Sequence, residues 1–234
     1  NNPRMILKTS CAVSGTGYLV SSEIIDKYDG WKCNLLTEDI EFSVVNILDG
    51  VRIGYCSDAM FYDEQPETFK QSWDQRLRWS KGFYQVMFKY GTQLVKMGFK
   101  RRELFVSCYD MFMTIAPATL PSIGCIVLNI VFLFLGASDP YTFSRILVPA
   151  LESIAFGLVS FCVLMFTIGA ITLITEWNKI IASPSKKIKS LFTFPFFMIT
   201  YIPISLVALV KKVEWKPITH CVSKSVDEIE NSRS

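Results

Sequence analysis

The side chains with the clearest capacity for chemistry are Gln75, Arg78 and Trp79. They stand at positions i, i+3 and i+4 of a helix that we predict from Thr68 to Gly82, so they leave one helix face together. A guanidinium group forms paired hydrogen bonds with phosphate oxygens, and an indole ring can stack on a pyranose ring. This face therefore suits a sugar diphosphate. The alternative is an ordinary surface cation–π pair of arginine and tryptophan.

A second group of polar residues, Thr37, Glu38 and Asp39, stands at the start of another predicted helix. Apolar residues at helical spacing follow it, and Gly50 is a plausible stop for that helix. Acidic side chains are favoured near a helix N-terminus because the helix dipole places positive charge there. Taken alone, the group is explained by helix capping as readily as by chemistry.

The composition excludes a wholly soluble protein and a disordered one. Half of the 234 residues are hydrophobic and 19% are charged, whereas about a quarter of a soluble domain is charged. Three stretches without charge, at 111–138, 153–175 and 190–210, are each long enough to span a bilayer. Because these stretches hold no charged residue or histidine, a transporter or pump is not indicated. We expect the chemistry to lie before them.

The charged residues and cysteines predict the compartment. Lysine and arginine are concentrated before the first apolar stretch and in 176–189, while 139–152 contains only Arg145, so the positive-inside rule places 1–110 and 176–189 in the cytoplasm. A net charge of +3 is too small to indicate nucleic acid. One histidine and seven cysteines without a C-x-x-C pair form neither a Cys/His zinc motif nor a disulfide framework, which is typical of a reducing compartment.

Residues 1–82 show α/β patterning. Runs rich in β-formers at 51–56 and 59–62 follow the helix that starts at Thr37. About 80 residues is small for a nucleotide-binding α/β domain. We therefore expect further strands upstream and interpret the chain as the C-terminal part of a longer protein.

Residues 83–110 are predicted to form amphipathic interfacial helices. The apolar stripe consists of Phe83, Met87, Tyr90, Leu94 and Met97, with Lys89, Lys96, Lys100, Arg101 and Arg102 alongside or just after it. A basic amphipathic helix next to a membrane span usually lies in the headgroup plane. The alternative is a helix packed on the soluble domain.

The two polar groups, in this order and before membrane spans, resemble the TED and Q-x-x-R-W motifs of processive family 2 glycosyltransferases, the cellulose, chitin and hyaluronan synthase type. The chain is most similar to the bacterial poly-N-acetylglucosamine synthase branch. Ser14, Gly15, Thr16 and Gly17 are similar to the Gly-rich strand that lines the acceptor site in this family. The resemblance covers essentially the whole chain. It implies the fold class α/β plus membrane helices, with the C-terminal part of a GT-A-type glycosyltransferase domain followed by interfacial and transmembrane helices.

The resemblance also implies how the TED residues act. Asp39 would be the general base that deprotonates the acceptor hydroxyl, and Thr37 and Glu38 would orient it. A carboxylate at a helix N-terminus stays ionised, which suits a base at neutral pH. The acceptor oxygen would then attack the anomeric carbon of a UDP-sugar with inversion, which gives a β-linkage.

The other implied roles concern the donor and the acceptor. Arg78 and Gln75 would hold the diphosphate, and Trp79 would stack on the acceptor sugar. The family uses a divalent cation, Mg or Mn, whose D-x-D ligands lie upstream of the acceptor strand. This chain contains no such motif, so we expect no metal ligand within it.

Residues 190–210 are expected to form a broken interfacial or re-entrant segment, which leaves 111–138 and 153–175 as the two transmembrane helices. Basic residues flank both ends of 190–210, and Pro195 and Pro203 would break a helix there. The tail 211–234 would then be cytoplasmic. Three of its residues resemble the family's gating loop: Trp215, Thr219 and His220. The alternative for the histidine is an exposed tail residue.

Together these features predict a membrane-embedded, inverting, processive β-glycosyltransferase that polymerises a sugar, N-acetylglucosamine by resemblance, from a UDP-sugar donor. The expected partners are that donor, the growing polysaccharide, the lipid bilayer and export or accessory subunits, with no nucleic acid. The expected location is the cell membrane, multi-pass, with the catalytic part in the cytoplasm. Two alternatives stay open: a non-processive transferase that adds one sugar to a lipid phosphate, and an inactive membrane scaffold.

Overall fold

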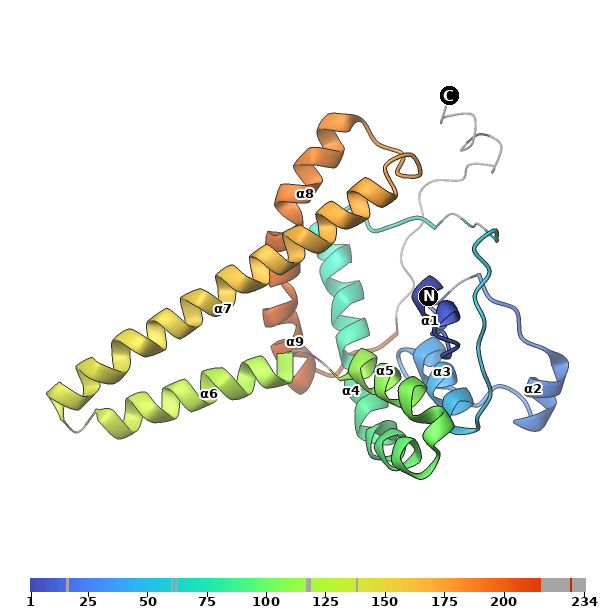
Figure 1. The fold of residues 1–234 in the computed structure, drawn as a ribbon, viewed down its shortest axis with the longest axis horizontal. Coiled ribbons are helices and arrows are strands. Elements are labelled where there is room, and N and C mark those ends of the chain that lie inside the picture. The colour runs from blue at the N-terminus through green and yellow to red at the C-terminus, as the bar shows by residue number, and fades with distance from the viewer. Residues whose placement is uncertain are drawn as a thin grey trace. The chain divides into compact units, whose positions relative to one another are not determined.

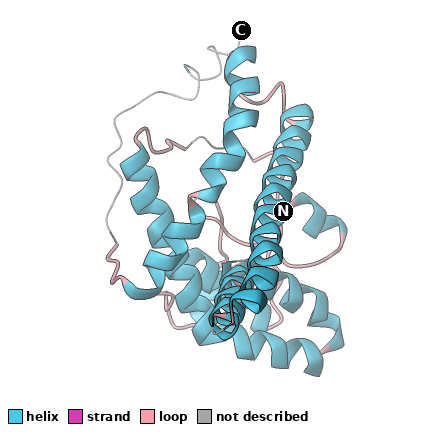
Figure 2. Cartoon of the chain, turned by 90° about the vertical axis from the view of Figure 1, so that its left-hand side faces the viewer, coloured by secondary structure: helices cyan, strands magenta, loops and turns pink. Residues whose placement is uncertain are grey.

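The computed structural model describes residues 1–15, 17–59, 61, 63–116, 119–137, 139–215 and 228. All regular structure in these ranges is helical (Figure 2). In chain order the helices are α1 (Asn2–Ile6), α2 (Ser22–Lys27), α3 (Glu38–Leu48), α4 (Phe69–Lys100), the 3-10 helix η1 (Arg102–Leu104), α5 (Phe105–Ile115), α6 (Thr119–Gly136), α7 (Pro140–Thr175), α8 (Pro184–Ile199) and α9 (Tyr201–Val210) (Figure 1).

The chain divides into two compact units. The first comprises Asn1–Pro117 and Ile204–Glu228, and the second comprises Ala118–Pro203 and Ile229–Ser234. All described residues of the candidate chemistry belong to the first unit, which contains α1 to α5 and most of α9.

The α/β class predicted for residues 1–82 is not confirmed, because no described residue lies in a strand. The run 51–56 is instead an irregular segment beside residues 10–11. The Cys11 N–H donates to the Ile53 carbonyl at 2.9 Å, and the Ile53 N–H donates to the Ser10 hydroxyl oxygen at 3.1 Å. A strand ladder needs repeated backbone pairs along its length. These two bonds supply only one such pair, so β-rich composition here does not produce a strand.

Helix α3 forms as predicted. Thr37 is its N-cap residue, and the helix ends at Leu48. Gly50 has a φ of +74°, the left-handed conformation that glycine adopts without strain, and it therefore serves as the predicted stop. Ile40, Val44 and Ile47 are buried, so this face of α3 enters the core of the first unit.

Helix α4 starts where predicted but continues well past the predicted end at Gly82. Thr68 and Gln71 form a capping box, in which the Thr68 hydroxyl accepts the Gln71 N–H and the Gln71 side chain accepts the Thr68 N–H. The helix then runs to Lys100 without a break. It passes through Gly82 because the buried side chains that follow, among them Val86 and Leu94, keep one face in the core.

The apolar stripe that we assigned to the membrane surface lies in this core. Leu94 is fully buried, and the other four members of the stripe pack around the same cluster with residues of α3 and α5. The stripe therefore joins helices of the first unit, which corrects the interfacial interpretation of these five side chains. A different face of α4, with Phe88, Val95 and Phe99, is exposed.

The first predicted span, 111–138, is divided between two helices. Met111 and Ile115 on α5 are fully buried in the core of the first unit. Helix α5 ends at Ile115, and the next residue, Ala116, has extended backbone with ψ of 109°. Pro117 follows it, and a proline forces the preceding residue out of the helical conformation.

The second unit contains α6, α7 and α8. In Figure 1, α6 and α7 run in opposite directions and diverge from the turn that joins them, and α8 contacts α7. By length and composition, the helical segments Pro140–Thr175 and Pro184–Val210 could each cross a membrane, with mean hydropathy of 2.4 and 1.9. The segment Val127–Gly136 is a shorter apolar helix.

Residues 190–210 comprise the end of α8 and all of α9, and whether they cross the membrane stays a prediction. Helix α8 contains Pro195 in its interior, and the break between α8 and α9 falls at Thr200. Pro203 lies in the first turn of α9. Backbone N–H groups in the first turn have no acceptor within the helix, so the missing N–H of proline removes no helical hydrogen bond there.

Candidate active site

Asp39 lies in the first turn of α3, beside the segment predicted to line an acceptor. Its side chain is half-buried, and Oδ1 accepts the N–H of Ile40 at 2.8 Å. Gly15 has a φ of +69°, and a Cβ atom added to it would lie 4.0 Å from Asp39 Oδ2. The structure thus brings the predicted base and the predicted acceptor segment together. Ser14 and Gly17 are exposed next to them, and Thr16 lies outside the described residues.

A chain of hydrogen bonds holds the acceptor segment against α3. The Val13 N–H donates to the Ser43 hydroxyl oxygen at 2.9 Å. That hydroxyl donates to the main-chain carbonyl of Asp39, also at 2.9 Å. Ser43 is fully buried, so the two bonds fix the backbone of Val13 relative to Asp39.

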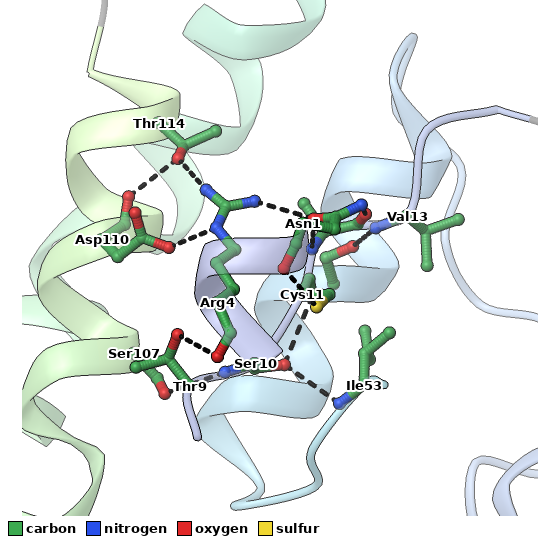
Figure 3. A network of polar contacts seen from close by, with 12 residues as sticks. Asn1, Arg4, Thr9, Ser10, Cys11, Val13, Ile53, Ser107, Asp110 and Thr114 are labelled. Atoms are coloured by element: carbon green, nitrogen blue, oxygen red, sulfur yellow. Dashed lines mark hydrogen bonds and ion pairs between the residues drawn. The ribbon is translucent and has the colours of Figure 1, made fainter. Parts of the chain in front are cut away.

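The start of the chain is fastened to α5, as Figure 3 shows. Arg4 Nε lies 2.6 Å from Asp110 Oδ2, and another Arg4 nitrogen donates to Thr114 Oγ1 at 2.9 Å. The Ser10 N–H donates to Ser107 Oγ at 3.2 Å. These contacts anchor the residues that lead into the acceptor segment.

An aromatic cluster is centred on Phe42, which lies one helical turn after Asp39 on α3. Phe42 is buried, and the rings of Trp31 and Tyr18 stack on it with centroid distances of 5.0 and 6.5 Å. Burial raises the pKa of Tyr18, and the charges of Glu38 and Asp39 raise it further. Tyr18 directly follows the glycine-rich segment that carries part of the family resemblance.

Helix α4 carries Gln75, Arg78 and Trp79, all three half-buried. The Arg78 guanidinium lies 5.8 Å from the ring centroid of Trp215. The structure therefore joins the Q-x-x-R-W residues to the first residue of the predicted gating loop. Thr219 and His220 lie outside the described residues. Within the described ranges, no ion pair joins Asp39 to Arg78.

The face of α4 next to these residues is held by α9. Leu77 and Tyr84 form a buried cluster with Ile204 and Ala208. Lys81 Nζ donates to the main-chain carbonyl of Ala208 at 3.0 Å, near the C-terminus of α9, where a cation is favoured by the helix dipole. These contacts fix α4 relative to the chain that leads to Trp215.

Glu41 is a further residue that the sequence interpretation missed. Its side chain is 0% exposed and carries four hydrogen bonds. Burial alone would raise its pKa, but the bonds from Lys89, the Leu35 N–H and Tyr90 outweigh burial, so the pKa of Glu41 is lowered. Because a buried charge must be paired, this carboxylate is a structural link between α3 and α4.

The described residues do not fit a divalent cation. They contain no group of three histidine, cysteine, aspartate or glutamate side chains that could hold a metal ion. Glu38 and Asp39 supply carboxylates at the site, but no third ligand accompanies them among the described residues.

Comparison with known proteins identifies the family of the chain. The family model described as glycosyl transferase family group 2 matches residues 3–210. The probable glycosyltransferase YdaM of Bacillus subtilis (strain 168) is 31% identical over 102 residues, which are 44% of this chain and 24% of that protein. A poly-beta-1,6-N-acetyl-D-glucosamine synthase of Staphylococcus aureus (strain COL) is 30% identical over 103 residues, again 44% of this chain and 24% of the relative.

The matched region thus spans about a quarter of the length of each curated relative, 24% in both cases. No solved structure matches the chain. The family model, in contrast, covers most of the chain, including Asp39, Arg78 and Trp79. The chain belongs to glycosyl transferase family group 2.

Proposed function

We propose that this chain forms the acceptor side of a membrane-embedded, inverting, processive β-glycosyltransferase that polymerises a sugar from a UDP-sugar donor. N-acetylglucosamine is the first candidate sugar, because one relative is named as a synthase of its polymer. The observation that carries the proposal is that the Thr37–Asp39 motif is packed on helix α4, which bears Arg78 and Trp79.

The reaction assigns one task to each group. The Asp39 carboxylate takes the proton from an acceptor hydroxyl, whose oxygen forms a bond to the anomeric carbon of the donor. The bond from that carbon to the UDP oxygen breaks, and the configuration inverts. Arg78, with Gln75, binds the diphosphate as negative charge grows on it. Trp79 stacks on the acceptor sugar, and the segment 14–17 lines the acceptor path. A divalent cation, if used, takes ligands outside the described residues.

The test is product length. Membrane vesicles with the full-length protein are incubated with radiolabelled UDP-N-acetylglucosamine and, in parallel, other UDP-sugars. A polymer of many residues that forms without release of short intermediates supports the proposal. A single sugar on a lipid phosphate indicates the non-processive alternative, and no transfer from any donor indicates a scaffold; either result would contradict the proposal.

We also propose that one exposed face of the first unit contacts lipid. Phe88, Val95 and Phe99 form an exposed apolar row on α4, at i, i+7 and i+11. The row continues onto α5, because the rings of Phe99 and Phe105 have centroids 6.0 Å apart. Four exposed basic side chains lie beside it: Lys96, Lys100, Arg101 and Arg102. An apolar row next to cations suits an anionic membrane surface.

Site-specific fluorescence tests this lipid contact. In a background without other cysteines, Phe99→Cys carrying an environment-sensitive dye should be quenched by brominated lipids. Gln93→Cys is the matched control, since it is an exposed position on the same helix but away from the apolar row. Equal quenching at both positions, or none at Phe99→Cys, would contradict the assignment.

The proposed topology has two transmembrane helices, with the catalytic part and the tail both in the cytoplasm. Cys56 in the first unit is exposed, and Cys221 lies in the tail beyond the described residues. Each is kept in turn as the single cysteine. A membrane-impermeant thiol reagent should label both in inverted vesicles and neither in right-side-out cells. Labelling of Cys221 from outside would indicate that 190–210 crosses the membrane as a third span.

A further inference from the structure

The loop formed by residues 34–37 leads directly into the helix turn that carries Asp39. Three consecutive backbone N–H groups of this loop donate to side chains. Those of Asn34 and Leu35 donate to Glu41 Oε2 at 2.9 and 3.0 Å. That of Leu36 donates to Gln85 Oε1 at 3.2 Å. The position of the 34–37 loop is thus set by one residue of α3 and one of α4.

The second carboxylate oxygen of Glu41 extends this link along α4. Glu41 Oε1 lies 2.7 Å from Lys89 Nζ and accepts the Tyr90 hydroxyl at 2.8 Å. The single carboxylate therefore joins the backbone of the 34–37 loop to two side chains of α4. If Glu41 lost its bonds to either the loop N–H groups or the α4 side chains, its buried charge would be incompletely paired, which would destabilise the folded protein.

Thr37, the last residue of the loop, rests on the backbone of α4 at Gly82. A Cβ atom added to Gly82 would lie 2.5 Å from Thr37 Cγ2 and 2.6 Å from Thr37 Oγ1. Real Cβ contacts are not this short, so only glycine permits the observed approach. Thr37 is 4% exposed and has little room to move away.

The α4 residues that hold the loop share a helix face with the residues that we assign to substrate. Gly82 lies three and four positions after Trp79 and Arg78, and Gln85 follows after three more. Side chains at such spacing lie one above the other on a helix. One face of α4 therefore carries both the proposed phosphate and sugar contacts and the support of the loop that ends in Asp39.

We propose that Gly82, Gln85 and Glu41 are positioning residues for sugar transfer. They fix the 34–37 loop on α4 and so set the place of Asp39 relative to Arg78 and Trp79. This inference rests on the proposed transferase function. None of the three needs to touch substrate. Their effect is expected on the rate of the bound complex, because a misplacement of about 1 Å in a reacting group can cost roughly 100-fold.

The first test is Gly82→Ala, with Gly91→Ala as the matched control. Both substitutions add one methyl group to a buried glycine of α4 and both raise helix propensity. At Gly91 the new atom meets the flexible end of Met87, which can turn aside. We expect kcat of Gly82→Ala to fall at least about 10-fold, with KM for the UDP-sugar within about twofold of wild type. Gly91→Ala should keep kcat within about twofold.

Second-site rescue separates positioning from damage to the fold. Thr37→Ala removes both atoms that lie nearest to the added one, Cγ2 at 2.5 Å and Oγ1 at 2.6 Å. In the Gly82→Ala background it should restore part of the lost kcat. Wild-type kcat in Gly82→Ala would overturn the proposal, and so would a loss that Thr37→Ala leaves unchanged.

Gln85 provides a variant pair that adds no atom to the helix backbone. Gln85→Met removes the acceptor for the Leu36 N–H, and Gln85→Glu keeps an oxygen at that place. We expect faster hydrogen exchange of the Leu36 amide and lower kcat in Gln85→Met, with both restored in Gln85→Glu. Faster exchange at unchanged kcat would overturn the positioning role. If the wild type transfers no sugar, the proposed function is wrong, and the positioning role is wrong with it. The exchange data would still show whether Gln85 holds the 34–37 loop.

Discussion

Asp39→Asn is expected to lower sugar transfer by about 100-fold or more, since a general base typically contributes 10²–10⁴-fold. The amide has nearly the shape of the carboxylate but cannot accept the proton of the acceptor hydroxyl. Its oxygen can still accept the N–H of Ile40, the bond that Oδ1 makes at 2.8 Å. The loss should therefore appear in kcat and not in folding or in the affinity for UDP-sugar.

The measurement is incorporation of labelled sugar by vesicles, together with donor binding. Asp49→Asn is the matched control, because Asp49 is the C-cap residue of the same helix and its side chain contacts Lys27 and Tyr28, away from the residues assigned to substrate. It should transfer sugar at the wild-type rate. If Asp39→Asn kept more than about a tenth of the wild-type rate, Asp39 would not be the base.

The start of α4 and the stop of α3 were predictable because their signals are local. Thr68 and Gln71 form a capping box within four residues, and Gly50 ends α3 through its own backbone conformation. Such signals need no partner from elsewhere in the chain. Thr37 is a local signal of the same kind at the start of α3, and it places Asp39 in the first turn of that helix.

The surroundings of α4 were not predictable in the same way. Hydrophobic periodicity indicates that a face is buried but not what covers it. The stripe with Leu94 packs on α3 and α5, whereas the exposed row with Phe88 and Phe99 occupies another face. Because α4 has two apolar faces, residue spacing alone does not tell which face packs on protein and which contacts lipid.

Glu41 shows why part of the site escaped sequence interpretation. In the sequence it is one more acid in the first turn of a helix, where acids are common at the surface. Its charge can be buried because Lys89, 48 residues further along the chain, forms an ion pair with it. A similar distance in sequence, 49 residues, separates Leu36 from Gln85. Pairings of this kind are set by how α3 packs on α4, which no local pattern encodes.

Arg78→Ala and Trp79→Ala are expected to fail in different ways, although the two residues are neighbours on α4. Removal of the guanidinium takes away charge-assisted hydrogen bonds to the diphosphate, worth about 1.5–3 kcal/mol. We therefore expect UDP to inhibit Arg78→Ala roughly 10- to 100-fold more weakly than wild type. Arg78→Lys should recover only part of this, because lysine keeps the charge but lacks the planar fork.

Trp79→Ala should leave UDP inhibition within about twofold of wild type, because only stacking on the sugar is lost. Chain extension should fall, and Trp79→Phe should restore part of it because a ring returns. The measurements are UDP inhibition constants and product length for each variant.

Arg78 also lies 5.8 Å from the ring of Trp215, so Trp215→Ala is the control for loss of that contact alone. If Trp215→Ala weakened UDP inhibition as much as Arg78→Ala, the arginine would act through the tail and not on the diphosphate directly. If Trp79→Ala and Arg78→Ala shared one inhibition constant, the two residues would not divide donor and acceptor between them.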